Sequence, residues 1–156
     1  MAHYLVTGAA GFIGARVSET LIGQGHTVVG VDNVNDAYDP LIKEYRLKRL
    51  EAVKGFKFHR RDISEKSVIA LFKDEKFDGV INLAARAGVR YSVENPWVFL
   101  ESNVTGTLNM FEVCRQYGCK KFILASTSSI YGENPVYPTP ETASSSEPMQ
   151  PYAASK

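Results

Sequence analysis

Apolar residues along the chain form short runs that alternate with longer segments of helical periodicity. The short runs are rich in Val, Ile, Leu and Phe, as expected for strands that helices cover on both faces of a sheet. Five such strands are predicted, at residues 4–7, 26–31, 56–59, 79–83 and 121–125.

Four helices are predicted between these strands, at residues 12–23, 39–53, 64–75 and 95–117. Ser64 is a suitable N-cap for the third helix, while Pro96 fits the first turn of the fourth and Gly118 its exit. Strands that alternate with helices form parallel sheets with right-handed crossovers. The sequence therefore predicts an α/β fold, with a doubly wound parallel sheet in one domain.

The composition is that of a globular protein, with 156 residues, 44% of them hydrophobic, and a net charge of +1. This charge balance gives no general attraction to nucleic acid or to a membrane surface, and no run approaches the roughly 20 apolar residues of a membrane span. The chain begins directly with a strand pattern and no signal peptide, so a cytoplasmic location is expected. Cys114 and Cys119 are interpreted as small apolar residues, because no second Cys/His pair completes a metal site.

Three glycines occupy the turn between the first strand and the first helix. Gly8 permits a tight turn, Gly11 lets backbone N–H groups approach a pyrophosphate at the helix N-terminus, and Gly14 lets the helix pack closely on the strand. Asp32 ends the second strand, where its carboxylate can accept the ribose hydroxyls of a dinucleotide. The same negative charge repels a 2′-phosphate, so the sequence predicts NAD rather than NADP.

Asp62 and Ile63 follow the third strand and have two interpretations. In one, Asp62 bonds the adenine amino group and Ile63 covers the ring. In the other, Asp62 only caps the following helix.

Tyr152 and Lys156 lie four residues apart, on one face of a helix if the segment is helical. Free tyrosine has a pKa of about 10, and a nearby ammonium favours its anion, so this pair is suited to proton transfer at neutral pH. Thr127, at the end of the fifth strand, offers a hydroxyl to the same substrate oxygen. The Pro- and Ser-rich segment between them is interpreted either as a disordered linker or as an active-site loop, and its position favours the loop, at residues 126–151.

The chain resembles the N-terminal half of extended short-chain dehydrogenases/reductases, in the NAD-dependent nucleotide-sugar epimerase/dehydratase family. The motifs TGAAGFIG, VDNVND, RDI, NLAA, NVTGT, STSSIYG and YAASK appear in the family's order along all 156 residues. The resemblance implies a Rossmann fold whose domain, residues 1–156, is incomplete and lacks the C-terminal substrate domain.

By this resemblance Thr127, Tyr152 and Lys156 are the catalytic residues, and Asn103 orders the active site from the fourth helix. Arg90, or alternatively Arg86, and Ser128 are the implied substrate-binding residues; Arg90 is equally well interpreted as an exposed loop cation. The implied cofactor-binding residues are Gly8, Gly11, Phe12, Ile13, Gly14, Asp32, Asn33, Asn35, Asp62, Ile63, Leu83, Ala84, Ala85, Asn103, Ala125, Tyr152 and Lys156.

Family dehydratases carry a carboxylate after the catalytic Thr, whereas this chain has Ser128 and Ser129 there. Elimination then lacks its base, which favours an epimerase. The segments VDNVNDAYDPLIKEYRL and AGVRYSVENP are similar to those of UDP-glucuronate 4-epimerases, so the expected reaction is transient oxidation and re-reduction at C4 of a UDP-sugar. Arg86 departs from the uncharged residue usual at its position. UDP-glucose/galactose 4-epimerase, a non-catalytic NAD-binding module and a structural fragment with a self-associating sheet edge remain alternatives.

The segment from Tyr152 to Lys156 is too short to nucleate a helix of its own. The sequence therefore leads us to expect that this piece alone has little or no epimerase activity and binds NAD weakly. A full-length protein of this family is expected to form a homodimer.

Overall fold

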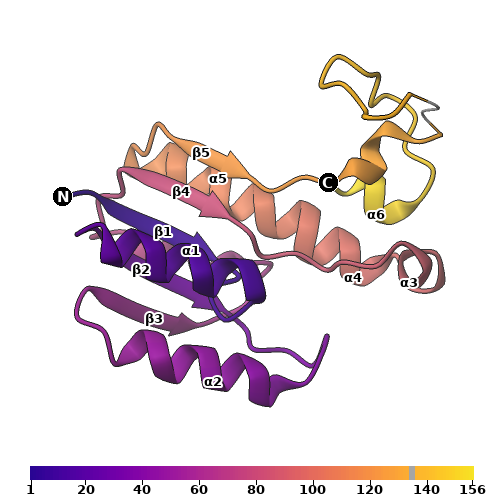
Figure 1. Cartoon of the computed structure of the whole chain (residues 1–156). Coiled ribbons are helices and arrows are strands. Elements are labelled where there is room, and N and C mark those ends of the chain that lie inside the picture. Colours follow the sequence, from indigo (N-terminus) through magenta and orange to yellow (C-terminus); the bar gives the residue numbers. More distant parts are fainter. Residues whose placement is uncertain (134–135) are drawn as a thin grey trace.

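The computed structural model describes residues 1–133 and 136–156. Its centre is a five-stranded sheet in the order β3-β2-β1-β4-β5, and every neighbouring pair of strands is parallel (Figure 1). The strands are β1 (His3–Thr7), β2 (Thr27–Asp32), β3 (Phe56–Arg60), β4 (Gly79–Asn82) and β5 (Phe122–Leu124). The predicted doubly wound parallel sheet is confirmed, and each strand lies close to its predicted bounds.

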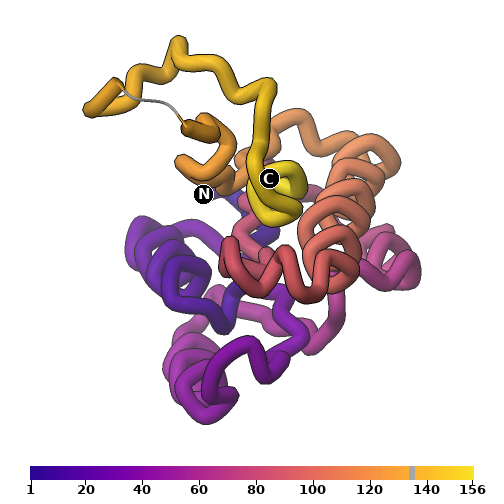
Figure 2. The backbone as a smooth tube through the Cα atoms, turned by 90° about the vertical axis from the view of Figure 1, so that its right-hand side faces the viewer, coloured from indigo at the N-terminus to yellow at the C-terminus, as the bar shows by residue number. Residues whose placement is uncertain are grey.

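Helices cover both faces of this sheet (Figure 2). On one face lie α1 (Phe12–Gly23) and α2 (Pro40–Glu51), and on the other lie the 3₁₀ helix η1 (Lys66–Phe72) and α5 (Gly106–Tyr117). The remaining short elements are α3 (Val89–Glu94), α4 (Trp97–Phe99), the π-helix η2 (Leu100–Thr105), the 3₁₀ helix η3 (Ser128–Tyr131) and α6 (Pro151–Ala154). Along the described residues, none of the helices combines the length and apolarity that crossing a membrane requires.

The larger core cluster lies between the sheet and the layer of η1 and α5. Strand side chains that face this layer alternate along each strand with side chains that face the other layer of helices. Val6 and Val28 are buried on that other face. The cluster joins Leu5, Val29, Val31 and Val80 of the sheet to Val68, Ile69, Phe72, Met110 and Val113 of the helices. Burial on both faces explains why these strands carry apolar runs.

The third predicted helix was wrong in type and start. Residues 66–72 form a 3₁₀ helix whose N-cap is Glu65, not Ser64. The backbone N–H and the hydroxyl of Ser64 both donate to Asp62 Oδ1, at 2.8 and 2.7 Å. The Asp62 side chain thus holds the chain in a turn that delays the helix.

The fourth predicted helix is real over residues 97–117, but it contains the π-helix η2 and ends at Gly118, which has φ +78°. A β-carbon at Gly106 would lie 2.7 Å from Ile63 Cδ1, so the start of α5 packs too closely on that loop for any larger residue. The short helices α3 and η3 were not predicted, because neither is long enough to show a period. The predicted loop 126–151 contains residues 134 and 135, which lie outside the described residues.

Candidate active site

The Gly-rich turn runs from the end of β1 to the start of α1. Gly8 has φ +67°, and a β-carbon there would lie 2.8 Å from the backbone N of Ala84. A β-carbon at Gly14 would lie 2.1 Å from Gly8 O. The N-cap of α1 is Gly11, which has no side chain to cap the helix. The N–H groups of the first turn are therefore not bonded to a capping side chain at the carboxyl edge of the sheet. This is the geometry that binds an anionic phosphate group.

Asp32 connects this turn to the loop after β2. Its carboxylate accepts the backbone N–H of Ala10 at 3.1 Å and that of Val34 at 2.7 Å. Val34 has φ +53°, a conformation that costs a β-branched residue about 1–3 kcal/mol. Packing of Val34 against Ala10 and Leu47 supports this backbone. Asp32 therefore shapes the pocket in addition to the ribose contact expected of it.

Asn33, Asn35 and Asp62 meet beside Asp32. Asn33 donates to Asp62 Oδ2 at 2.6 Å and accepts the backbone N–H of Asn35 at 3.1 Å. Burial raises the pKa of Asp62, but hydrogen bonds from Ser64 and Asn33 outweigh it and leave this pKa below its usual value. Asp62 fixes a local turn and lines the pocket, but the N-cap of η1 is Glu65, so the interpretation of Asp62 as the cap of that helix is wrong. Its bond to an adenine amino group stays a prediction.

Two basic residues of α2 lie near this pocket and were missed by the sequence reasoning: Lys43 lines it, and Arg46 contacts Tyr38, which lines it. The Lys43 ammonium donates to Asn35 O at 2.9 Å and to Asn35 Oδ1 at 2.8 Å. Arg46 donates to the Tyr38 hydroxyl at 2.9 Å and lies over the Tyr38 ring. Lys43 lies four residues before the buried Leu47, so its place on the apolar face of α2 was the available signal.

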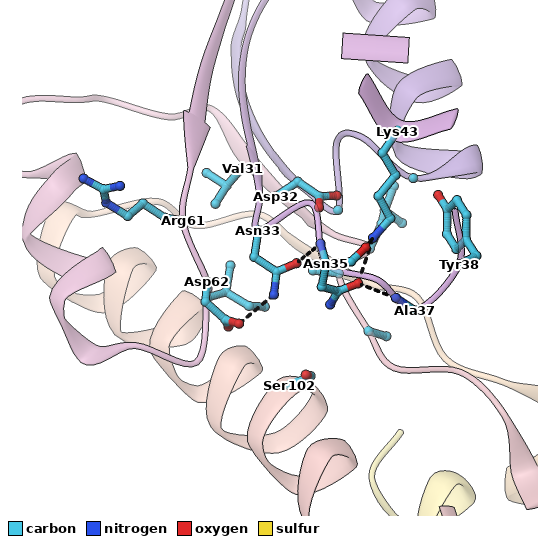
Figure 3. A pocket seen from close by; sticks show the side chains of 16 residues that line it. Val31, Asp32, Asn33, Asn35, Ala37, Tyr38, Lys43, Arg61, Asp62 and Ser102 are labelled. Atoms are coloured by element: carbon cyan, nitrogen blue, oxygen red, sulfur yellow. Dashed lines mark hydrogen bonds between the residues drawn. The ribbon is translucent and has the colours of Figure 1, made fainter. Parts of the chain in front are cut away.

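One pocket at the carboxyl edge of the sheet collects most of the residues expected to hold a cofactor (Figure 3). Ten of them line it: Gly8, Gly11, Asp32, Asn33, Asn35, Asp62, Ile63, Leu83, Ala84 and Ala85. The sequence reasoning missed Val31, Ala37, Tyr38, Lys43, Arg61 and Ser102, which line it as well.

A buried network of hydrogen bonds positions the loop after β4. The Thr7 hydroxyl accepts the backbone N–H groups of Leu83 and Ala84, at 3.1 and 3.0 Å, and donates to Asn82 Oδ1. Asn82 in turn donates to the Thr107 hydroxyl at 2.9 Å. Thr7 and Asn82 are fully buried, and both were missed because their role depends on the neighbouring strand.

Asn103 joins this loop to the segment that carries Tyr152. It accepts the backbone N–H of Arg86 at 2.8 Å, and its amide donates to Arg86 O at 3.1 Å and to the Ser155 hydroxyl at 2.8 Å. The Ser155 hydroxyl donates to Tyr152 O at 2.8 Å. Asn103 lies in the π-helix η2, an irregularity often found at functional sites.

Thr127, Tyr152 and Lys156 lie in segments that meet beyond the end of β5. The helix η3 packs against α6, and the Ser126 hydroxyl donates to Lys156 O at 3.3 Å. The Thr127 hydroxyl accepts the Ser129 N–H at 3.2 Å, and the Tyr152 ring contacts Phe99 edge-on at 6.0 Å. Burial lowers the pKa of Lys156.

Several predicted residues lie outside the pocket lining. The side chains of Phe12 and Ile13 are exposed at the start of α1, and Ala125 continues β5 by donating to Asn82 O at 3.2 Å. Arg90 and Ser128 lie on α3 and η3, and both helices pack against α6. Arg90 is therefore helical rather than in a loop. Arg86 points elsewhere: its guanidinium lies 3.9 Å from Asp36 Oδ1, in the loop after β2.

Within residues 1–133 and 136–156, no group of three or more His, Cys, Asp or Glu side chains is placed to hold a metal ion. The arrangement instead has a Gly-rich turn at an uncapped helix N-terminus, a polar pocket with an acidic side chain, and beyond it the segments that carry Thr127, Tyr152 and Lys156.

Comparison with known proteins agrees with this geometry. The family model described as GDP-mannose 4,6 dehydratase matches residues 5–156. UDP-glucuronate 4-epimerase of Thermodesulfobacterium geofontis is 51% identical over 158 residues, which cover 100% of this chain and 48% of that protein. The chain thus spans about half the length of the curated relatives it matches.

Two solved structures have the same fold. UDP-Glc/GlcNAc 4-epimerase from Campylobacter jejuni has a TM-score of 0.90 and 32% identity, over 100% of this chain and 46% of that one. UDP-glucuronic acid 4-epimerase from Bacillus cereus, in complex with UDP-glucuronic acid and NAD, has a TM-score of 0.88 and 34% identity, over 99% and 48%.

Proposed function

This chain belongs to the family described as GDP-mannose 4,6 dehydratase, and from that premise we propose that it is the NAD-binding part of a nucleotide-sugar 4-epimerase. The observation that carries the proposal is the coincidence, at one sheet edge, of a dinucleotide-type pocket with the Thr127, Tyr152 and Lys156 segments. The NAD-bound relatives of high structural similarity support it.

The residues present fit NAD. Gly8 and Gly14 let the turn pack closely against Ala84 and against its own backbone, where a β-carbon at either position would clash. The uncapped start of α1 would supply N–H groups for the pyrophosphate. Asp32 and the amides of Asn33 and Asn35 would hold the adenosine ribose, and Ile63 would cover the adenine. When bound, NAD would accept a hydride from C4 of the sugar and return it to the opposite face.

The residues of the chain supply the proton transfer and the orientation. The phenolate of Tyr152 would take the proton of the sugar 4-hydroxyl and later return it, while the Thr127 hydroxyl holds that oxygen. The ammonium of Lys156 would stabilise the phenolate. Asn103 and Ser155 hold the backbone of this segment in place.

UDP-glucuronate is the proposed substrate, because chains named for it are among the relatives. Ser128 and Ser129 stand where a dehydratase needs a carboxylate. Arg90 would pair with the sugar carboxylate by a charge-assisted bond, and Ser128 would bond the sugar. Arg86 is not proposed for that role, since it faces Asp36 at the other end of the site.

Turnover tests the proposal, in this chain and in a chimera where it replaces the aligned segment of the Thermodesulfobacterium geofontis relative. We expect the chimera to convert UDP-glucuronate to UDP-galacturonate and the chain alone to show little or no activity. Tyr152→Phe should lower kcat of the chimera by about 10²-fold or more. The matched control is Tyr137→Phe, which changes an exposed tyrosine of the preceding loop and should leave kcat unaltered. A folded, NAD-loaded chimera that turns over no UDP-sugar would refute the epimerase proposal.

UDP-glucose/galactose 4-epimerase is the second candidate, because several of the solved relatives act on UDP-glucose by name. A substrate panel on the same chimera separates the two. NAD binding without turnover of any sugar nucleotide would instead indicate an NAD-binding module.

A homodimer is also proposed. Exposed apolar side chains recur every three or four residues along the helical segment 97–111, and a second copy would cover them. They are Trp97, Leu100, Val104, Leu108 and Phe111. Sedimentation of the chimera should show a dimer that Leu108→Glu converts to monomer, whereas Leu41→Glu, on α2, should leave it a dimer.

A further inference from the structure

The Gly-rich turn and the loop after β2 both form walls of the proposed cofactor pocket. Gly8 and Gly11 line the pocket from the turn, and Tyr38 lines it from the far end of the loop, just before α2. A ligand held between two segments leaves faster when one of them can move away from the other. The contacts that join this loop to the turn therefore bear on how long a dinucleotide stays bound.

The loop is anchored at several points along its length. At its start the Asp32 carboxylate accepts the backbone N–H of Ala10, in the turn, at 3.1 Å. Near its middle, Asn35 accepts the ammonium of Lys43 through both its carbonyl and its side-chain oxygen (Figure 3). Tyr38 lies beyond these anchors and is 41% exposed, so the far end of the loop needs a contact of its own.

Arg46 of α2 connects this far end back to the Gly-rich turn. Its guanidinium donates to the Tyr38 hydroxyl at 2.9 Å and to Ala10 O at 3.5 Å. The same group lies over the Tyr38 ring, 5.8 Å from its centroid, and over the Phe12 ring, at 5.7 Å. A planar guanidinium can stack on aromatic rings and donate hydrogen bonds within its own plane. Arg46 thus contacts both segments, although it does not line the pocket itself.

Phe12 gains a role from this contact. Its side chain was expected to bind the cofactor, but it is 79% exposed and lies outside the pocket lining. Its ring instead offers the guanidinium a platform on the turn, at the first residue of α1.

We propose that Arg46 is a positioning residue, which clamps the Tyr38 end of the loop after β2 to the Gly-rich turn and so slows the release of the bound dinucleotide. The inference rests on the proposed NAD pocket. A cation near a pocket has an alternative role, the long-range attraction of an anionic ligand, which raises the association rate constant. A clamp lowers the dissociation rate constant instead, so a kinetic measurement separates the two roles.

Stopped-flow fluorescence of NADH, measured on the chimera, gives both rate constants. Arg46→Met keeps an apolar stem and removes the cation and its donors. We expect it to raise the dissociation rate constant about tenfold, the equivalent of about 1.4 kcal/mol, and to change the association rate constant less than about twofold. The matched control is Arg49→Met, which should leave both constants unchanged. Arg49 lies on the same helix but stacks over Tyr45 and pairs with Glu19, neither of which lines the pocket.

A second variant tests whether Arg46 acts through the loop. Tyr38→Leu removes the partner of Arg46 and should by itself raise the dissociation rate constant. In that background Arg46→Met should add less than about twofold, because the effects of residues in contact are not additive.

Three results would overturn the clamp: an effect of Arg46→Met confined to association, equal effects of Arg46→Met and Arg49→Met, or an undiminished effect of Arg46→Met in the Tyr38→Leu background. Failure of the unsubstituted chimera to bind NADH would instead overturn the proposed function, and the clamp with it.

Discussion

Asn103 makes three hydrogen bonds that connect the loop after β4 to the Tyr152 segment, so its replacement tests how the site is assembled. Asn103→Leu keeps the size of the side chain and removes all three bonds. Each bond contributes about 1 kcal/mol on average, so we expect the free energy of unfolding to fall by about 3 kcal/mol.

Asn109 on α5 is the matched control. It is 6% exposed against 3% for Asn103, and its amide donates to Ile63 O at 2.7 Å. Asn109→Leu should therefore cost about 1 kcal/mol. The same substitution at similar burial gains the same apolar transfer energy, so the difference between the variants isolates about two hydrogen bonds.

Urea unfolding followed by circular dichroism measures both variants, with the slope of the transition as a check that the unfolded states are comparable. Hydrogen exchange of the Arg86 amide should accelerate in Asn103→Leu and not in Asn109→Leu. Equal destabilisation of the two variants, with no change at Arg86, would refute the claim that Asn103 holds the two segments together.

Three further outcomes are expected. Gly14→Ala places a β-carbon 2.1 Å from Gly8 O, so it should lower the free energy of unfolding by about 3 kcal/mol and abolish NAD binding. Gly23→Ala, at the other end of α1, is the control. Its β-carbon would have no atom within 4 Å, so the same urea assay should find it neutral or slightly stabilising. Because the pKa of Asp62 is lowered on folding, its contribution to stability is present above about pH 4 and is lost as the pH falls further. Asp62→Asn should therefore flatten the acid limb of a curve of unfolding free energy against pH. Asp74→Asn, at an exposed position, should leave that curve unchanged. Lys43→Met should weaken NAD binding in calorimetry, because the Asn35 turn loses its anchor, and retention of full affinity would contradict that role.

The sequence by itself determined the sheet and the location of the Gly-rich turn. The apolar runs and their helical spacers specify the parallel sheet, because period and burial are local properties of the chain. The helix over residues 12–23 was predicted to the residue. The glycine spacing and Asp32 also located the pocket. Only glycine fits at position 8 beside Ala84 and at position 14 beside Gly8, so the turn is marked by residue type alone.

The tertiary structure alone decided how the walls of the site are held. Thr7 and Asn82 act through residues that folding brings from other strands and loops, so no local pattern marks them. The place of Lys43 on the apolar face of α2 is a local signal of burial, but its bond to Asn35 depends on how the loop after β2 folds back. The bonds of Asn103 to Arg86 and Ser155, and the direction of Arg86 toward Asp36, likewise depend on segments that are distant along the chain. Spacing along a chain fixes which residues share a face, whereas partners distant in sequence are fixed only when the elements pack.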